Sequence, residues 1–201
     1  MATGSSAARP VLVIASGNPG KVREFSHLLG DLGLEIRPQP KGLEVDETGT
    51  TFAENARLKA AAVAQVTGCW ALADDSGLSV RALGEAPGLH SARYADSDAA
   101  RITRLLRELA GASDRSARFT AALAVADPEG TIRLEVEGLC PGVILEEPRG
   151  DDGFGYDPVF LVPETGLTYA EMDKDLKGRI GHRGQAFALL APQLQALLCS
   201  N

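Results

Sequence analysis

Short apolar stretches alternate along the chain with longer segments in which apolar residues recur every three or four positions. The short stretches predict buried strands, and the three-to-four spacing predicts helices with one apolar face. The predicted strands are Val11–Ala15, Leu34–Arg37, Trp70–Ala73, Phe119–Ala126, Thr131–Glu137, Gly138–Leu145 and Val159–Val162. The predicted helices are Lys21–Leu29, Thr51–Val66, Asp96–Ala110 and Arg183–Leu198, with Pro192 bending or restarting the last one.

Cap and turn signals indicate where several of these elements begin and end. Thr51 and Glu54 have the spacing of a helix capping box, and Gly30 and Gly68 follow the first two helices. Asp127–Gly130 is a turn signal between two strands, so it predicts a hairpin. Because the hairpin interrupts an otherwise alternating order of strands and helices, the pattern predicts an α/β fold with a mixed sheet.

The composition narrows the class of protein. The 201 residues are 44% hydrophobic and show no repeat or long linker, which suits one domain at 11–201 behind a loose tail at 1–10. The net charge of −7 argues against nucleic acid as a partner. No apolar run is long enough to predict a membrane-spanning helix. The three cysteines, Cys69, Cys140 and Cys199, lie far apart in the sequence, which suits a reducing compartment, the cytoplasm. Their spacing and odd number argue against a zinc site or a disulfide framework.

The first candidate for chemistry is the turn after the first strand, Ser16-Gly17-Asn18-Pro19-Gly20-Lys21. A strand, a glycine turn and a helix start gather free backbone N–H groups, which attract phosphate, and Lys21 adds a full positive charge. The turn is not a P-loop, because its glycines are too close together and Val22 follows the lysine. An ordinary strand-to-helix turn with a solvated lysine is the alternative.

Polar residues of opposite charge open the second helix. Glu54 and Asn55 lie in its first turn, Lys59 shares a face with Asn55, and Glu47 lies in the loop before them. An acid, an amide and a base on one face suit a site for metal and phosphate. A capping box with solvated charges explains the same residues equally.

Two adjacent acids follow the third predicted strand, in Asp74-Asp75-Ser76-Gly77. Carboxylates at the carboxyl ends of sheet strands are frequent Mg²⁺ ligands, and a cation offsets the repulsion between neighbouring acids. The same residue types also favour an ordinary turn.

Two later segments combine glycine with aromatic or basic groups. Asp152–Pro158 places Phe154 and a second ring among glycines, with Asp157 beside them, which suits stacking on a flat base. Rings packed in the core are the alternative for that segment. Lys177–Arg183 carries three basic residues and His182, which suits recognition of phosphate or a carbonyl group, with a solvated basic loop as the alternative.

Taken in this order, the five segments resemble the inosine triphosphate pyrophosphatase family, which acts on non-standard purine nucleotides. The similarity spans roughly Val11 to Leu190. The first two motifs are Ser16-Gly17-Asn18-x2-Lys21 and Glu47-Thr48-Gly49-x-Thr51-Phe52-x-Glu54-Asn55-Ala56-x2-Lys59-Ala60. The third combines Asp74-Asp75-Ser76-Gly77-Leu78 with Pro87-Gly88-x2-Ser91-Ala92-Arg93-Tyr94. The last two are Gly153-Phe154-Gly155-Tyr156-Asp157-Pro158 and His182-Arg183-Gly184. Five motifs in the same order are far more specific than any one of them. The structural alternatives given above for the single segments are therefore all much less favoured.

The resemblance implies a fold, an activity and residue roles. The fold would be a long central mixed β-sheet flanked by helices, in two lobes with an active cleft between them, and usually a homodimer. The activity would be Mg²⁺-dependent hydrolysis of ITP, dITP or XTP to the monophosphate and pyrophosphate. The implied metal ligands are Glu47, Asp74 and Asp75, with Asp75 also the catalytic base. The implied substrate contacts are Ser16, Gly17, Asn18, Pro19, Gly20, Lys21, Asn55, Lys59, Ser76, Phe154, Gly155, Tyr156, Asp157, Lys177, His182 and Arg183.

The chain departs from the family pattern at two positions. Gly181 stands where the family usually has serine before the His-Arg pair, and Gly178 stands where it often has asparagine. Because a hydroxyl and an amide are lost, base affinity or selectivity is expected to differ from that of relatives.

The expected mechanism places the metal between the acids and the phosphates while Asp75 activates a water molecule near the α-phosphate. The lysines Lys21, Lys59 and Lys177 would offset charge on the phosphates. This arrangement predicts release of pyrophosphate in one piece.

The expected selectivity for the base depends on hydrogen-bond donors. Donors from His182 or Arg183 facing position 6 of the base would favour a 6-oxo purine over adenine.

Three other functions are alternatives to this one. They are a related pyrophosphatase for pyrimidine or modified nucleotides, a nucleotide-binding regulator without catalysis, and a structural α/β domain. The Phe154–Asp157 segment and the His182-Arg183 pair favour the purine enzyme, and the clustered acids favour catalysis.

Overall fold

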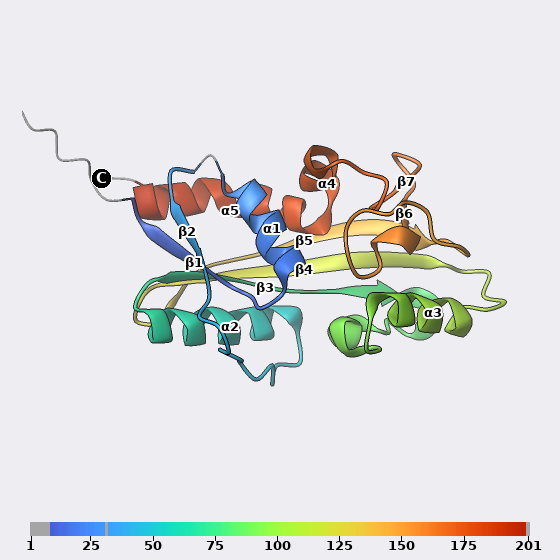
Figure 1. Ribbon diagram of the computed structural model, residues 1–201, viewed down its shortest axis with the longest axis horizontal. Coiled ribbons are helices and arrows are strands. Elements are labelled where there is room, and N and C mark those ends of the chain that lie inside the picture. The colour runs from blue at the N-terminus through green and yellow to red at the C-terminus, as the bar shows by residue number, and fades with distance from the viewer. Residues whose placement is uncertain (1–8, 31, 200–201) are drawn as a thin grey trace, which may run out of the picture.

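The computed structural model describes residues 9–30 and 32–199, and within them one seven-stranded mixed sheet carries helices on both faces. The strands lie in the order β2-β1-β3-β4-β5-β6-β7 (Figure 1). Both neighbours of β1 run parallel to it, and the later pairs are antiparallel. The strands are β1 Val11–Ala15, β2 Glu35–Pro38, β3 Trp70–Val80, β4 Ser116–Ala126, β5 Ile132–Ile144, β6 Phe160–Val162 and β7 Leu167–Thr168. The predicted mixed α/β sheet is confirmed, whereas the predicted tail lies mostly outside the described residues.

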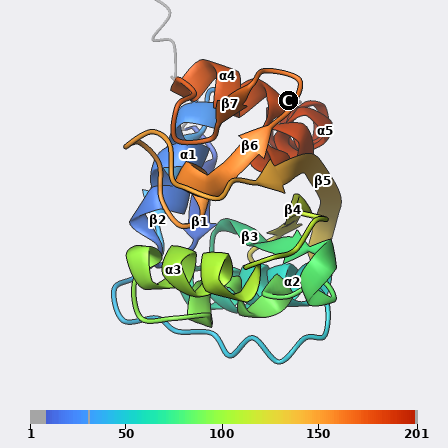
Figure 2. The ribbon, with the colours of Figure 1, turned by 90° about the vertical axis from the view of Figure 1, so that its right-hand side faces the viewer.

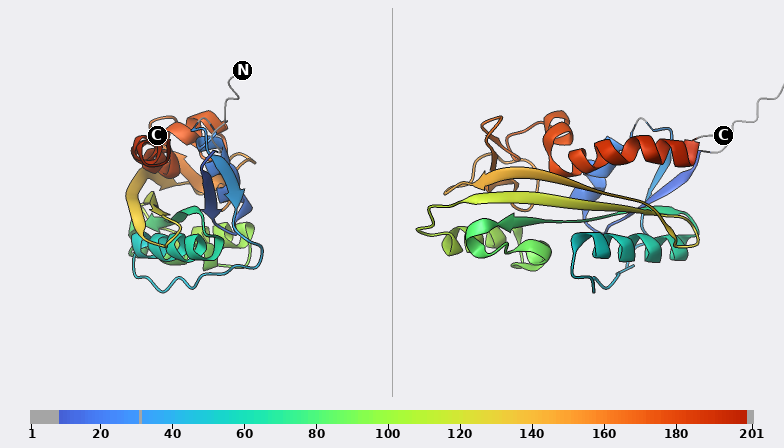
Figure 3. Two further views of the ribbon diagram at one scale, coloured as in Figure 1. Left: turned by 90° about the vertical axis from the view of Figure 1, so that its left-hand side faces the viewer. Right: turned by 180° about the vertical axis from the view of Figure 1, so that it is seen from behind.

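The helices form two layers, one on each face of the sheet (Figures 1 and 3). Helices α2 and α3 cover one face, and α1, α4 and α5 cover the other. Their bounds are α1 Pro19–Leu28, α2 Phe52–Thr67, α3 Asp98–Glu108, α4 Lys174–Ile180 and α5 His182–Cys199, and short 3₁₀ helices span Arg81–Leu83, Gly88–Arg93 and Asp157–Val159. Within the described ranges, none of the helices combines the length and the apolar character needed to cross a bilayer.

Strand β1 shows why both faces of the sheet are covered. Its apolar side chains alternate, so that Leu12 and Ile14 pack with α1 and α5 while Val13 and Ala15 pack with α2. Successive side chains of a strand point to opposite faces, and an unbroken apolar run therefore requires a core on each side. A third core cluster lies around Tyr169, toward the other end of the sheet. There α3 and α4 lie on opposite faces of the sheet (Figure 2).

Side chains cap the first two long helices, and the cap predicted at Thr51 is confirmed. Asn18 caps α1, because its Oδ1 accepts from the backbone N of Gly20 at 2.8 Å. Thr51 caps α2 through the N of Glu54 at 3.1 Å. The Glu54 carboxylate accepts from Thr50 N at 2.6 Å, so it stabilises the loop before the cap and the capping box is only half formed.

Several predicted bounds were wrong because long-range pairing overrides local turn signals. Strand β3 does not end before the acids but runs through Asp74–Gly77, because β4 pairs with it antiparallel from residue 71 to residue 80. The two strands predicted on either side of residue 138 are the single strand β5. Short elements β7 and α4 were not predicted, and α4 places Lys177 on a helix instead of in a loop. Helix α5 continues through Pro192.

Gly138 lies in the middle of β5 because α5 crosses the strand there at close range. A Cβ atom at this position would come within 2.2 Å of Ala186 N and 2.3 Å of His182 O, which are backbone atoms of α5. Gly138→Ala is therefore expected to lower the free energy of unfolding by about 1–3 kcal/mol or more, as overpacking does in close-packed cores. Thermal unfolding measures the loss, and Gly178→Ala is a comparison in which the new Cβ atom would meet Leu28 Cδ2 at 3.5 Å, an ordinary van der Waals contact. Equal Tm values for the Gly138 variant and the wild type would contradict the packing argument.

Candidate active site

The two aspartates of β3 lie where the chain leaves strand β1. Strand β1 pairs with β3 as far as Ala15, which lies opposite Ala73, and then enters the Ser16–Gly20 turn. The next residue of β3 is Asp74, and Lys21 at the start of α1 reaches its backbone oxygen at 3.4 Å. Because the pairing of β1 with β3 stops at Ala15, the predicted phosphate-binding turn lies beside the predicted acids Asp74 and Asp75.

Asp74 is the centre of a buried charge cluster. Its Oδ2 lies 2.6 Å from Lys21 Nζ and 3.4 Å from Arg183 Nε. Ser76 Oγ donates to the same oxygen at 3.0 Å and accepts from Arg183 Nη2 at 2.7 Å. Burial by itself would raise the pKa of Asp74, but the charges of Lys21 and Arg183 lower it below its usual range. The carboxylate is therefore ionised at neutral pH and compensates two buried cations.

Asp75 belongs to an adjoining cluster built on α2. Lys59 Nζ lies 2.7 Å from Asp75 Oδ1 and 2.8 Å from Glu47 Oε1. Asn55 Nδ2 donates to Asp75 Oδ2 at 3.2 Å, and its own oxygen accepts from Gly49 N at 2.8 Å. The shared helix face predicted for Asn55 and Lys59 is confirmed, because both side chains meet the same carboxylate.

The two carboxylates that share Lys59 differ in their acidity. Burial raises the pKa of Asp75, and the nearby Lys59 ammonium only partly opposes this. Burial also acts on Glu47, but hydrogen bonds and charge from Lys59 and Arg93 lower its pKa to about 2. Arg93 Nη1 lies 2.7 Å from Glu47 Oε2. Asp75 is therefore the more basic of the two carboxylates.

The chemistry of this cluster suits a hard cation such as Mg²⁺. Asp74 Oδ1 is buried and has no hydrogen-bond partner in the described part of the chain. Glu47 and Asp75 both contact the Lys59 ammonium, so this pair of carboxylates already binds one cation. Carboxylate oxygens are the protein ligands that Mg²⁺ prefers. Across residues 9–30 and 32–199, no three acidic, histidine or cysteine side chains already form a metal-binding group.

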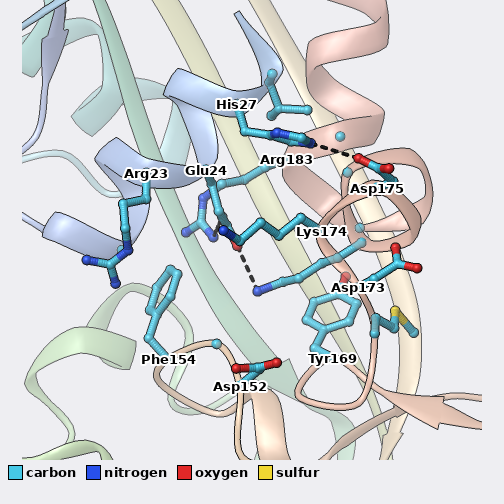
Figure 4. Close-up of a pocket in the computed structure, with 18 of the residues that line it drawn as sticks. Arg23, Glu24, His27, Asp152, Phe154, Tyr169, Asp173, Lys174, Asp175 and Arg183 are labelled. Atoms are coloured by element: carbon cyan, nitrogen blue, oxygen red, sulfur yellow. Dashed lines mark hydrogen bonds and ion pairs between the residues drawn. The ribbon is translucent and has the colours of Figure 1, made fainter. Parts of the chain in front are cut away.

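A cavity of about 830 Å³ opens next to the Asp74 cluster, between α1, the 151–154 loop, α4 and the start of α5 (Figure 4). Arg183 belongs to its wall and also contacts Asp74, so the cavity and the charge cluster adjoin. The ring of Phe154 points into the cavity. It packs so closely on Gly20 that a Cβ atom at residue 20 would come within 2.6 Å of it. The aromatic wall therefore begins directly beside the predicted phosphate turn.

His182 is held rigidly at the base of this cavity. Its ring stacks on Phe119 with centroids 4.6 Å apart, and its Nδ1 lies 3.4 Å from Tyr169 Oη. The backbone N of His182 also donates to Tyr169 Oη at 3.2 Å. Its Nε2 is buried and has no hydrogen-bond partner among the residues that the structure describes. Burial first, and then Arg183, lower the pKa of His182 well below its usual value, so the ring is neutral.

Glu24 is a prominent cavity residue that the sequence motifs did not reveal. Its two carboxylate oxygens lie 2.7 Å from Lys177 Nζ and 2.8 Å from Arg183 Nη1. Lys177 also lies 2.7 Å from Asp157 Oδ2, which accepts from Phe154 N at 2.9 Å. The one available signal was its position three residues after Lys21, one helical turn along the same face of α1.

The remaining predicted contacts are not all in the cavity. Tyr156 is buried in the third core cluster, and its hydroxyl donates to Ser91 O at 2.9 Å, so it is a packing residue in this arrangement. Gly181 and Gly178 line the cavity. A Cβ atom at Gly181 would come within 2.6 Å of Lys177 O, which explains why no larger residue fits here without a shift of α4.

The fold and the site together define an α/β protein with a charged site beside the carboxyl end of β1, next to a partly aromatic cavity. The chain belongs to the Ham1 family, whose family model matches residues 12–193. This match confirms the family resemblance seen in the five motifs.

Close relatives and solved structures agree with this assignment. The dITP/XTP pyrophosphatase of Synechococcus sp. is 63% identical over 94% of this chain and 91% of its own. That of Parasynechococcus marenigrum is also 63% identical, over 94% and 97% of the two chains. The solved HAM1 protein from Coxiella burnetii superposes with a TM-score of 0.83 at 45% identity, covering 92% of this chain and 98% of its own.

Proposed function

We propose that this protein hydrolyses the non-standard purine nucleoside triphosphates ITP, dITP and XTP to the monophosphate and pyrophosphate. This activity would remove these nucleotides from the pool before their incorporation into DNA or RNA. The similar proteins from Synechococcus sp. and Parasynechococcus marenigrum are dITP/XTP pyrophosphatases. The observation that carries the proposal is the position of Arg183, which lines the cavity and contacts Asp74 beside Lys21. One ligand with a flat base and a chain of phosphates would reach both places.

The proposed cofactor is Mg²⁺, held by Glu47, Asp74 and Asp75. When bound, the ion would reduce the charge repulsion between the phosphates and an incoming water molecule. Asp75 would accept a proton from that water, a role that its raised pKa favours over the more acidic Glu47. Lys21 would offset negative charge that develops on the phosphates, and the backbone N–H groups of its turn would orient them.

We propose that His182 reads position 6 of the base. We propose the tautomer in which the Tyr169 hydroxyl donates to Nδ1 and Nε2 carries the ring proton, since Tyr169 Oη lies 3.4 Å from Nδ1. An Nε2–H donor matches the 6-oxo acceptor of hypoxanthine or xanthine, whereas the 6-amino group of adenine would leave it unpaired. An unpaired buried donor costs about 1–3 kcal/mol, equivalent to roughly 5–150-fold discrimination against ATP.

A triphosphate panel tests the activity and its selectivity. Pyrophosphate release is measured on ITP, XTP, GTP, ATP and a pyrimidine triphosphate, and ITP and XTP are expected to be the best substrates. Preference for ATP or for the pyrimidine nucleotide would contradict the proposal. Binding of ITP without pyrophosphate release would favour a nucleotide-binding regulator instead.

Metal removal is expected to abolish turnover on ITP. Two acids and the phosphates would repel one another without a divalent ion, so treatment with a chelator should stop pyrophosphate release. Excess Mg²⁺ should restore it, while excess Na⁺ at matched ionic strength is the control. Full turnover after exhaustive chelation would contradict the metal assignment.

We further propose that the protein is a cytoplasmic homodimer. The family resemblance supports the dimer, and the cytoplasmic nucleotide pool is where the proposed substrates arise. Light scattering of the purified protein is expected to give a mass twice the 21.1 kDa of one chain. A mass equal to one chain at micromolar concentration would contradict the dimer.

A further inference from the structure

The loop that carries Phe154 is tied to a helix that does not line the cavity. The backbone N of Gly155 donates to Asp98 Oδ2 at 2.7 Å. Asp98 is the first residue of α3, and α3 lies on the opposite face of the sheet from α4, which forms part of the cavity wall (Figure 2). This single hydrogen bond therefore joins the aromatic wall of the cavity to the far layer of the molecule.

The Asp98 carboxylate is itself held in place. Its other oxygen, Oδ1, lies 2.6 Å from Arg101 Nη1, and Arg101 Nε donates to Ala95 O at 3.0 Å. The cap of α3 is a different residue, Ser97, whose Oγ accepts from Ala100 N at 3.2 Å. The contact from Asp98 to the loop is therefore separable from the capping of its helix.

The loop needs an external anchor because its own backbone is permissive. Gly153 and Gly155 have φ values of +85° and +63°, a region that glycine enters freely, and they flank Phe154 on both sides. Asp157 fixes the N of Phe154 from within the loop. Asp98 is the anchor that fixes the following residue from outside.

We infer that Asp98 is a positioning residue that holds the Phe154 ring for stacking on a purine base, acting through the N–H of Gly155. The inference rests on the proposed function, because it requires a purine nucleotide in the cavity. A second anchor, from the Tyr156 hydroxyl to Ser91 O, is buried and independent of Asp98. It keeps the loop folded when Asp98 is replaced.

Binding measurements with IMP and with pyrophosphate distinguish contacts to the base from contacts to the phosphates. In Asp98→Ala, the affinity for IMP is expected to fall about tenfold, since a misplaced ring loses its stacking contact, while the affinity for pyrophosphate stays unchanged. Calorimetric titration with each ligand in the presence of Mg²⁺ measures both. Asp98→Asn keeps an oxygen for Gly155 and should retain most of the IMP affinity. Ser97→Ala is the matched control, because it weakens α3 without touching the loop.

A double-mutant cycle tests whether Asp98 acts through Phe154. Phe154→Ala alone should weaken IMP binding, and adding Asp98→Ala should cause no further loss. The inference is overturned if the Asp98→Ala variant binds IMP like the wild type, or if its pyrophosphate affinity falls as much as its IMP affinity. It is also overturned if the loss of IMP affinity in the double variant equals the product of the losses in the two single variants. A wild type that binds IMP but does not hydrolyse ITP would contradict the proposed activity and leave the role of Asp98 intact.

Discussion

Asp75→Asn is expected to lower kcat on ITP by about 10²–10⁴-fold while the protein still folds and binds the nucleotide. Asparagine keeps the shape of the side chain and its contact with Asn55 or Lys59, but its amide cannot take a proton from water. Because Asp75 is partly buried, its ionised form is disfavoured in the folded state and its pKa is raised. The substitution removes this penalty, so Tm is expected to stay within a few degrees of the wild type or to rise.

Two measurements decide this prediction. Pyrophosphate release under saturating ITP gives kcat, and a binding titration with IMP shows whether the site is intact. In the wild type, turnover should fall as the pH falls through the raised pKa of Asp75, because the base must be ionised to act. Near-normal turnover in the variant would remove Asp75 from the mechanism.

Asp74→Asn is expected to cause a large loss of stability, in contrast to Asp75→Asn. The Asp74 side chain is 1% exposed and lies against Lys21 and Arg183, so the neutral amide leaves two buried cations without their shared anion. Breaking a buried ion pair in this way costs about 3–5 kcal/mol, which corresponds to a fall in Tm of roughly 6–20 °C for a chain of this size. Asp75→Asn is the matched control, since it changes the neighbouring carboxylate in the same strand.

Ligand and pH dependence give independent checks on Asp74. Pyrophosphate should raise the Tm of Asp74→Asn more than that of the wild type, because it supplies negative charge to Lys21 and Arg183. The folded-state pKa of Asp74 is depressed, so its contribution to stability is present above the unfolded pKa of about 3.9 and is lost as the pH falls further. The variant should therefore lose less stability than the wild type over that acidic range. A variant as stable as the wild type at neutral pH would contradict the ion-pair argument.

The sequence was most informative where local chemistry decides the structure. Apolar runs located β1, and the cap signal at Thr51 located the start of α2, because Thr51 bonds to a backbone group only three residues away. Order and spacing of the five motifs also identified the family. Short elements were missed, since α4 and β7 are too short for a periodic pattern to stand out.

Only the tertiary structure showed how the site is assembled. Asp74 and Asp75 have the composition of a turn but lie within a strand, because antiparallel pairing with β4 continues past them. Glu24 and Asp98 belong to none of the five motifs, and each makes its contact with a residue more than fifty positions away. Such contacts depend on which strands are neighbours and where their pairing stops.

The sequence by itself thus determined most of the elements and the family, and it predicted most of the residues now proposed to act in the site. The tertiary structure decided which of those residues meet, because the register between β1 and β3 ends at Ala15 and Ala73 and leaves Lys21 beside Asp74. Long-range register is set by the packing of whole layers and not by any local pattern of residues.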